Sequence, residues 1–252
     1  MVLYTTATAT TSNVDDRSCG FSCVRDSVTF MPIPVIQKQC YEIVAPPDET
    51  IITNDFTTRL YVTPPGVDAS CKEDFQMTIY AKHDNNTGLN KYIDHFGYSQ
   101  IEMTDRSEMA SSTYAGQMPM YRLGSIINLP DNRTAYGHFA HYIPVVEEWT
   151  TGLTNFHTLK KDCYIEFYVD QNGLNLDQIK VDGISLTKYT YTVNYMFYFK
   201  KQFGHFILPL HGYGLHSIEN GGNYFLCVVC KNVNGPYNAV GYLAGFNKRR
   251  FS

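Results

Sequence analysis

Hydrophobic and polar residues alternate in short runs along most of the chain. These runs are rich in Tyr, Phe, Val and Ile and are separated by Pro, Gly, Asn and Asp, a pattern typical of β-strands joined by turns. Helical periodicity is almost absent. We therefore predict a mainly β fold, an antiparallel β-sandwich of jelly-roll-like type with roughly eight to ten strands in two packed sheets. The predicted strands include residues 29–33, 41–44, 57–62, 75–80, 163–169, 189–199 and 224–230.

Two parts of the chain lack this alternation. Residues 1–27 are rich in Thr, Ser, Ala and Asp, a composition that buries too little apolar surface to fold alone. We predict an extended or partly helical N-terminal arm held by a partner chain, followed by a single β-sandwich domain over residues 28–252. Residues 83–135 carry polar clusters and predict a long loop with an interaction role. Faint helical patterns place helices at residues 12–27 and 87–110.

The charge content argues against several functional classes. Only 17% of the 252 residues are charged, and 20 Lys and Arg against 24 Asp and Glu give a net charge of -4. Such a chain has no basic field for a nucleic-acid backbone, so we expect no specific nucleic-acid partner. Residues 1–7 lack the basic and apolar regions of a signal peptide, and no apolar run approaches about 18 residues, so we expect neither secretion nor a membrane partner. Without secretion, the Asn-x-Thr sequons at residues 85–87 and 132–134 are ordinary loop composition.

The seven cysteines follow no disulfide framework. Their odd number and scattered positions predict that most are buried, reduced thiols. Cys19 and Cys23 lie in the arm and are the candidates for a crosslink. Cys227 and Cys230 have the spacing of half a zinc site, but positions i and i+3 of a strand face opposite sides. We therefore expect no metal there.

Common catalytic signatures are absent from the sequence. It has no phosphate-binding loop, no dinucleotide-binding glycine pattern, no nucleophile elbow and no His-Glu-x-x-His motif. His205, His211 and His216 are close in sequence, and histidines paired with carboxylates form acid–base or metal sites. In an aromatic segment punctuated by glycine they are more often interface or packing residues, and we predict that role. The expectation is therefore no catalytic residue, no metal and no enzyme activity.

Aromatic residues are the one compositional excess, because 20 Tyr and 15 Phe stand against a single Trp. Tyr and Phe are strand formers, and they are also favoured in interfaces because they bury a large area at low entropic cost. With so little charge, the chain is suited to packing against copies of itself. A phenol has an ordinary pKa of about 10, so assemblies held by neutral tyrosines are expected to be lost as the pH rises through the phenol pKa. The candidate residues for assembly or pH response are Tyr189, Tyr191, Tyr195, Tyr198, Tyr213, Tyr237, Tyr242, His205, His211, His216, Arg249 and Arg250.

Two parts of the chain carry a resemblance to a known family. The matching residues are His205-Phe206-Ile207-Leu208-Pro209, Tyr213, Ser217-Ile218, Lys231-Asn232, Tyr237-Asn238 and Val240-Gly241, with Thr11-Ser12-Asn13 and Asp16-Arg17 near the N-terminus. In these residues the chain resembles the polyhedrins of cypoviruses. The resemblance implies a β-sandwich whose arm clasps neighbours, trimers packed into a dense cubic lattice, and virus particles embedded in it. It also implies occlusion bodies in the host cell cytoplasm that dissolve at alkaline pH.

Polyhedrins of this family also hold nucleotides between subunits, so the resemblance alone implies a nucleotide. No residue of this sequence matches a motif that would carry that property over. We therefore expect no cofactor.

Two further classes of protein fit the same sequence. A jelly-roll viral capsid or penton protein shares the fold and the self-assembly but closes a shell instead of building a crystal. Arms that bind a genome are basic, whereas residues 1–27 carry only Arg17 and Arg25 as cations. A β-sandwich hydrolase using the three histidines is the third hypothesis. The expected function is a non-enzymatic, self-assembling viral structural protein that forms an occlusion body.

Overall fold

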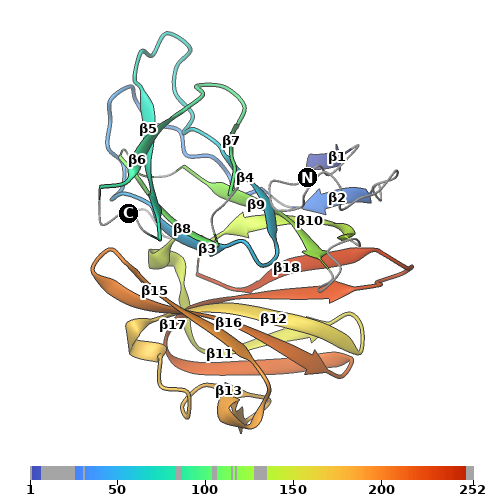
Figure 1. Ribbon diagram of the computed structural model, residues 1–252. Coiled ribbons are helices and arrows are strands. Elements are labelled where there is room, and N and C mark those ends of the chain that lie inside the picture. Colours follow the sequence, from blue (N-terminus) through green and yellow to red (C-terminus); the bar gives the residue numbers. More distant parts are fainter. Residues whose placement is uncertain are drawn as a thin grey trace.

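Antiparallel sheets stacked in two layers make up the computed structural model of the chain (Figure 1). It describes residues 2–6, 26–30, 32–82, 87–103, 107–114, 116, 118–127 and 135–247. The upper layer in Figure 1 comes from the first half of the chain, and the lower layer, yellow to red, from the second half. The antiparallel β-sandwich predicted from the sequence is confirmed.

The upper layer contains two four-stranded sheets. Its strands are β3 (Glu49–Thr53), β4 (Thr57–Val62), β5 (Phe75–Ala81), β6 (Leu89–Ile93), β7 (Ser99–Ile101), β8 (Glu108–Thr113), β9 (Met120–Ile127) and β10 (Ala135–Ile143). The orders are β3-β8-β5-β6 in one sheet and β10-β9-β4-β7 in the other. A separate two-stranded ladder of β1 (Val2–Thr6) and β2 (Asp26–Phe30) lies beside β10 (Figure 1).

Residues 87–110, where we predicted a helix, form strands. β6, β7 and the start of β8 lie in this segment, and β6 and β8 pair with the two sides of β5. These partners are distant in sequence, and sheet pairing overrides a weak local pattern. The long loop predicted over residues 83–135 is wrong for the same reason, because β6 to β9 lie within it. The helix predicted at residues 12–27 lies almost entirely outside the described residues.

The lower layer is one eight-stranded sheet with the order β14-β13-β17-β12-β16-β15, to which β11 and β18 add by pairing with β17. Its strands are β11 (Thr150–Thr158), β12 (Asp162–Asp170), β13 (Lys180–Val181), β14 (Ile184–Ser185), β15 (Thr192–Tyr198), β16 (Lys201–His211), β17 (Gly214–Lys231) and β18 (Ala239–Gly245). Three short 3-10 helices connect strands: η1 (Val146–Glu148), η2 (Gln171–Gly173) and η3 (Leu186–Lys188). The strands predicted at residues 163–169 and 224–230 are β12 and the second half of β17.

Strand β12 has two buried faces because it lies between two hydrophobic cores. Ile165, Phe167 and Val169 belong to a core enclosed within the lower layer. Tyr168 belongs to the core that joins the two layers. Glu166 lies two residues before Tyr168 and therefore faces the same way, toward the upper layer. This alternation puts a carboxylate in the interior of the protein.

Candidate functional site

A buried group of polar side chains lies where the upper layer packs on β12. Arg122 of β9 donates from Nη1 to Oε2 of Glu166 at 2.6 Å, and both side chains are fully inaccessible to solvent. Arg122 also donates from Nε to Nε2 of His141, in β10, at 3.0 Å. One guanidinium thus links β9 to its sheet neighbour β10 and to β12 in the other layer.

The second carboxylate oxygen of Glu166 is also occupied. It accepts hydrogen bonds from the Tyr168 hydroxyl and from Nε2 of His205, each at 3.0 Å. The backbone N–H of Thr53, at the end of β3, donates to the Tyr168 hydroxyl at 3.0 Å. We name this group the interlayer cluster; its members are Thr53, Arg122, His141, Glu166, Tyr168 and His205.

Charge pairing outweighs burial in the interlayer cluster. Burial acts to raise the pKa of Glu166, but the charge of Arg122, helped by His205, lowers that pKa to about 2. Burial likewise opposes the charge of Arg122, and the carboxylate of Glu166 more than offsets this and holds the guanidinium pKa above its ordinary value. Glu166 and Arg122 therefore form an ion pair that persists far into the acid range.

His141 is neutral and its tautomer follows from its neighbours. Burial and the nearby Arg122 charge lower the pKa of His141 to about 3. A guanidinium can only donate, so Nε2 of His141 accepts from Arg122. The proton is therefore on Nδ1, which donates to the Tyr142 carbonyl oxygen at 2.7 Å.

This arrangement fits bracing of the two layers better than catalysis. Every member of the interlayer cluster is buried, so a substrate does not reach it in this conformation. His205 is the member of the cluster that lies near an exposed group, because its Nδ1 is 3.7 Å from Oδ2 of the half-exposed Asp55. The hydrogen bonds of the cluster hold strands of both layers together.

The three histidines singled out from the sequence do not form one site. His205 is buried in the interlayer cluster. His211 is exposed and its Nδ1 lies 2.9 Å from Oδ1 of Asp162. His216 lies on β17, with Nδ1 2.7 Å from Oδ2 of Asp182. Each imidazole faces a different carboxylate, so the structure supplies no common acid–base centre for the hydrolase hypothesis.

The candidate tyrosines differ in exposure. Tyr195, Tyr213 and Tyr237 are exposed, Tyr189, Tyr191 and Tyr242 are half-buried, and Tyr198 is buried. The Tyr198 hydroxyl donates to Oε1 of Glu108 at 3.2 Å, so this side chain belongs to the core of the monomer and not to its surface. The Tyr242 hydroxyl bonds the backbone N–H and C=O of His157, and burial raises its pKa. The candidates Arg249, Arg250, Cys19 and Cys23 lie outside the described residues.

The cysteines correct our prediction of mostly reduced thiols. Disulfides join Cys40 to Cys71 and Cys163 to Cys230, which is four of the five cysteines in the part of the chain that the structure describes. The pairing of β12 with β17 places Cys163 directly opposite Cys230, and such long-range register is invisible in spacing along the sequence. Cys227 is buried and free, and burial raises its thiol pKa to about 12. Cys227 and Cys230 face different cores, as positions i and i+3 of a strand do, and Cys230 is bonded to Cys163.

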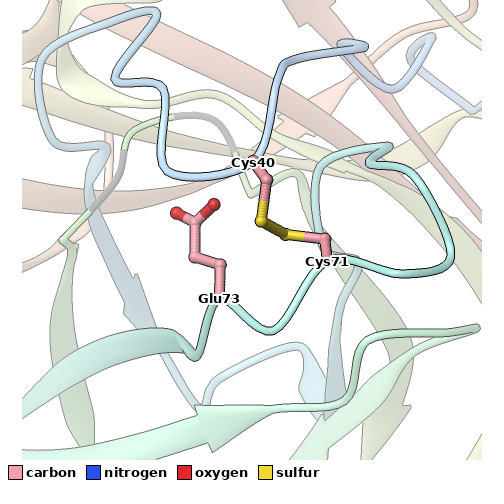
Figure 2. A group of neighbouring side chains, drawn as sticks. All are labelled: Cys40, Cys71 and Glu73. Carbon is pink, nitrogen blue, oxygen red and sulfur yellow. A yellow bond between two sulfur atoms is a disulfide. The ribbon is translucent and has the colours of Figure 1, made fainter.

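Cys40, Cys71 and Glu73 have ligand atoms close enough together to surround a metal ion (Figure 2). Figure 2 shows the two sulfurs joined, which leaves Glu73 as the one anionic group of the three. Lys38 already compensates that charge, because its Nζ lies 2.6 and 2.7 Å from the two carboxylate oxygens. The Tyr41 backbone N–H donates to the same carboxylate at 2.7 Å. The group is therefore a partly buried crosslink beside an ion pair between Lys38 and Glu73.

A small pocket lies between β10 and β18. Its volume is about 220 Å³, and its polar lining comes from His138, Asn234 and Asn238. Sites for organic ligands usually measure about 300–1,000 Å³. The Phe139 ring forms part of the wall and lies under the Arg122 guanidinium, 5.6 Å from ring centroid to Cζ. The pocket suits a small polar group.

Sequence reasoning missed Arg122, His141 and Glu166 as a unit. The available signal was one acid in the apolar segment 163–169 and one arginine in the apolar segment 118–127. Charged residues are almost never fully buried unless they are paired. That rule indicates that each of these residues needs a partner if it is buried, but only the packing of the two layers shows that they are partners of each other.

A scan against known protein families finds no model that matches this chain, and a search of curated proteins finds no significant match. Among the described residues, no helix is long and apolar enough to cross a membrane.

Proposed function

We propose that this chain is a non-catalytic, disulfide-bonded β-sandwich that acts by contact with other macromolecules in an oxidising compartment. The observation that carries the contact role is the exposure of large aromatic side chains. Side chains that are half or more exposed include Tyr41, Tyr92, Phe96, Tyr114, Phe197, Tyr213 and Tyr237. Aromatic residues are enriched where proteins meet, whereas the strongly shifted ionisable groups of the described residues, those of the interlayer cluster and Cys227, are buried.

Exposed large apolar side chains are also close together in sequence along β6 and the connection that follows it. Leu89, Tyr92, Phe96 and Tyr98 lie within ten residues and are all exposed. The Tyr98 ring makes an edge contact with Tyr61 at 5.1 Å between centroids, which holds it in place at the surface. A segment that carries several exposed apolar side chains favours an interaction role for this part of the molecule.

The two disulfides of the described residues support the proposal of an oxidising compartment. Disulfides form and persist in secreted, lumenal or periplasmic proteins and are rare in the cytosol. The Asn-x-Thr sequons at residues 85–87 and 132–134 would be acceptors for N-glycosylation in such a compartment. These features support folding in a secretory pathway and weigh against the cytoplasmic location implied by the polyhedrin resemblance.

Thiol counting tests the proposal directly. The chain is isolated from its source without reductant, unfolded, alkylated and examined by peptide mass spectrometry. We expect Cys227 to be alkylated, and Cys40, Cys71, Cys163 and Cys230 to be alkylated only after reduction. Quantitative alkylation of all five before reduction would contradict the oxidising compartment.

An occlusion-body protein is the second proposed function, favoured by the exposed tyrosines Tyr195, Tyr213 and Tyr237. In this proposal the chain builds an intracellular crystal that embeds virus particles. A capsid or penton protein would use the same surfaces to close a shell.

Expression in insect cells tests this second proposal. We expect micrometre crystals that dissolve above about pH 10, because phenols whose pKa is raised on burial in an interface stabilise the assembly below pH 10 and lose that contribution as the pH rises. Replacing Tyr195, Tyr213 and Tyr237 with Phe is expected to raise the pH of dissolution. The control is Tyr198→Phe, which alters a tyrosine inside the core. Closed shells, soluble monomers or crystals stable at about pH 11 would contradict the proposal.

A further inference from the structure

Strand β15 forms one edge of the lower sheet. It has seven residues and pairs along its whole length with β16, without a bulge. No other strand in the described part of the chain pairs with β15. A row of backbone N–H and C=O groups on its outer side is therefore available for another strand.

In the described part of the chain, the edge strands β14, β11 and β6 carry protections that β15 lacks. The opposite edge of the lower sheet, β14, has two residues. β11 carries a bulge at Gly152, and the backbone N–H and C=O of its residue His157 are both hydrogen-bonded to the Tyr242 hydroxyl. β6 contains Lys91, whose Nζ binds the Gln100 carbonyl at 2.6 Å. β15 contains no charge, proline or glycine, which are the usual protections of an edge strand.

The side chains of β15 present an apolar surface next to this open edge. Val193, Tyr195 and Phe197 are exposed, whereas Met196 and Tyr198 point into the core between the layers. A two-residue turn joins β15 to β16, so the register between the two strands is fixed. The exposed face of β15 is therefore a constant feature of the fold.

We infer that β15 pairs antiparallel with β15 of a second copy of this chain, about a twofold axis at Tyr195. This inference rests on the contact function proposed above and names the partner. In that register Tyr195 lies opposite its own copy, and Val193 lies opposite Phe197. Aromatic and β-branched pairs of this kind are favourable across antiparallel strands. Asn194 lies opposite Met196 on the other face, so no like charges meet along the strand.

A second copy fits this edge better than a charged partner. The strand has no charged side chain that would recognise one. A twofold axis needs only a self-complementary patch, and the alternation of Val193, Tyr195 and Phe197 is symmetrical about its centre. Two lower sheets would join into one continuous sheet.

The test measures the mass of the oxidised chain by sedimentation over a range of concentrations. We expect wild type to form dimers. Tyr195→Lys places two cations opposite each other and is expected to weaken the dimer by about a hundredfold or more. Tyr195→Glu is expected to do the same, and an equimolar mixture of the two variants should restore a dimer through opposite charges. The control is Tyr114→Lys, the same change at an exposed tyrosine of the upper layer, which should leave the dimer unchanged.

Hydrogen exchange on unmodified protein supplies a second measurement that needs no variant. Amides of residues 192–198 should exchange more slowly in concentrated than in dilute solution. A wild type that stays monomeric, a Tyr195→Lys variant that still dimerises, or unchanged exchange in β15 would each overturn the pairing. None of these outcomes changes the thiol count, so failure of this inference is distinguishable from failure of the proposed compartment.

Discussion

Replacing Glu166 with Gln is expected to lower the free energy of unfolding by about 3–5 kcal/mol. The substitution keeps the shape of the side chain but leaves the buried charge of Arg122 without the carboxylate that accepts its hydrogen bond at 2.6 Å. A buried charge that loses its partner is among the most destabilising defects in a protein. Equilibrium unfolding of the oxidised chain in denaturant at neutral pH measures the effect.

Two variants show whether burial of the pair causes this loss. Glu219→Gln breaks an exposed ion pair, Lys180 to Glu219 at 3.4 Å, and should cost less than about 1 kcal/mol. Arg122→Met combined with Glu166→Leu removes both buried charges and should recover much of the stability lost in the single variant. A cost for Glu166→Gln no greater than that of Glu219→Gln would show that the interlayer cluster does not brace the two layers.

The same measurement against pH tests the charge states of the cluster. The pKa of Glu166 is lowered to about 2 by Arg122 against the opposing effect of burial. Its contribution is therefore complete above pH 4.5, the ordinary value, and is lost as the pH falls toward 2. The pKa of His141 is lowered to about 3 by burial. Below pH 6.5, the ordinary value, the unfolded chain therefore binds a proton at His141 that the folded chain does not bind. Both groups make the folded state less stable in acid. In Glu166→Gln the share of this pH dependence that comes from the carboxylate should be absent.

Local patterns were enough to predict three strands of the lower layer, β12, β15 and the second half of β17, whereas β11, β13, β14, β16 and β18 were not predicted. Residues 163–169 and 224–230 are apolar and rich in β-branched and aromatic side chains, and they form β12 and part of β17. Residues 87–110 were predicted wrongly because β6 and β7 are short and partly polar. Such strands depend on neighbours that are distant in sequence, and a local pattern cannot identify these neighbours.

The candidate site was only partly predictable for a related reason. His205 was singled out from its spacing to His211 and His216, but its partner Glu166 comes from another strand of the sheet. Arg122 comes from the other layer. Sequence rules indicate that a lone buried charge needs a partner, and the partner is known only once the layers are packed.

Replacing both Cys163 and Cys230 with Ala is expected to cost about 4 kcal/mol, the loop-entropy value for a crosslink of this span. The two residues are 67 positions apart in sequence and lie opposite each other on β12 and β17. Without the bond the unfolded chain gains conformational freedom, and the core of the lower layer loses two buried sulfurs. Denaturant unfolding with and without reductant measures the loss.

Measurements with reductant separate the stability lost with the Cys163–Cys230 bond from the stability lost when the two buried sulfurs are removed. Of the two disulfides in the described residues, reductant should act on both in wild type, but on Cys40–Cys71 alone in the Cys163→Ala, Cys230→Ala variant. Cys227→Ala is the matched control, because it removes a buried sulfur that forms no disulfide and should leave the response to reductant unchanged. If wild type unfolds at the same denaturant concentration with and without reductant, the bonds contribute nothing. The chain would then fold equally well in a reducing cytoplasm, and the occlusion-body proposal would gain over the oxidising compartment.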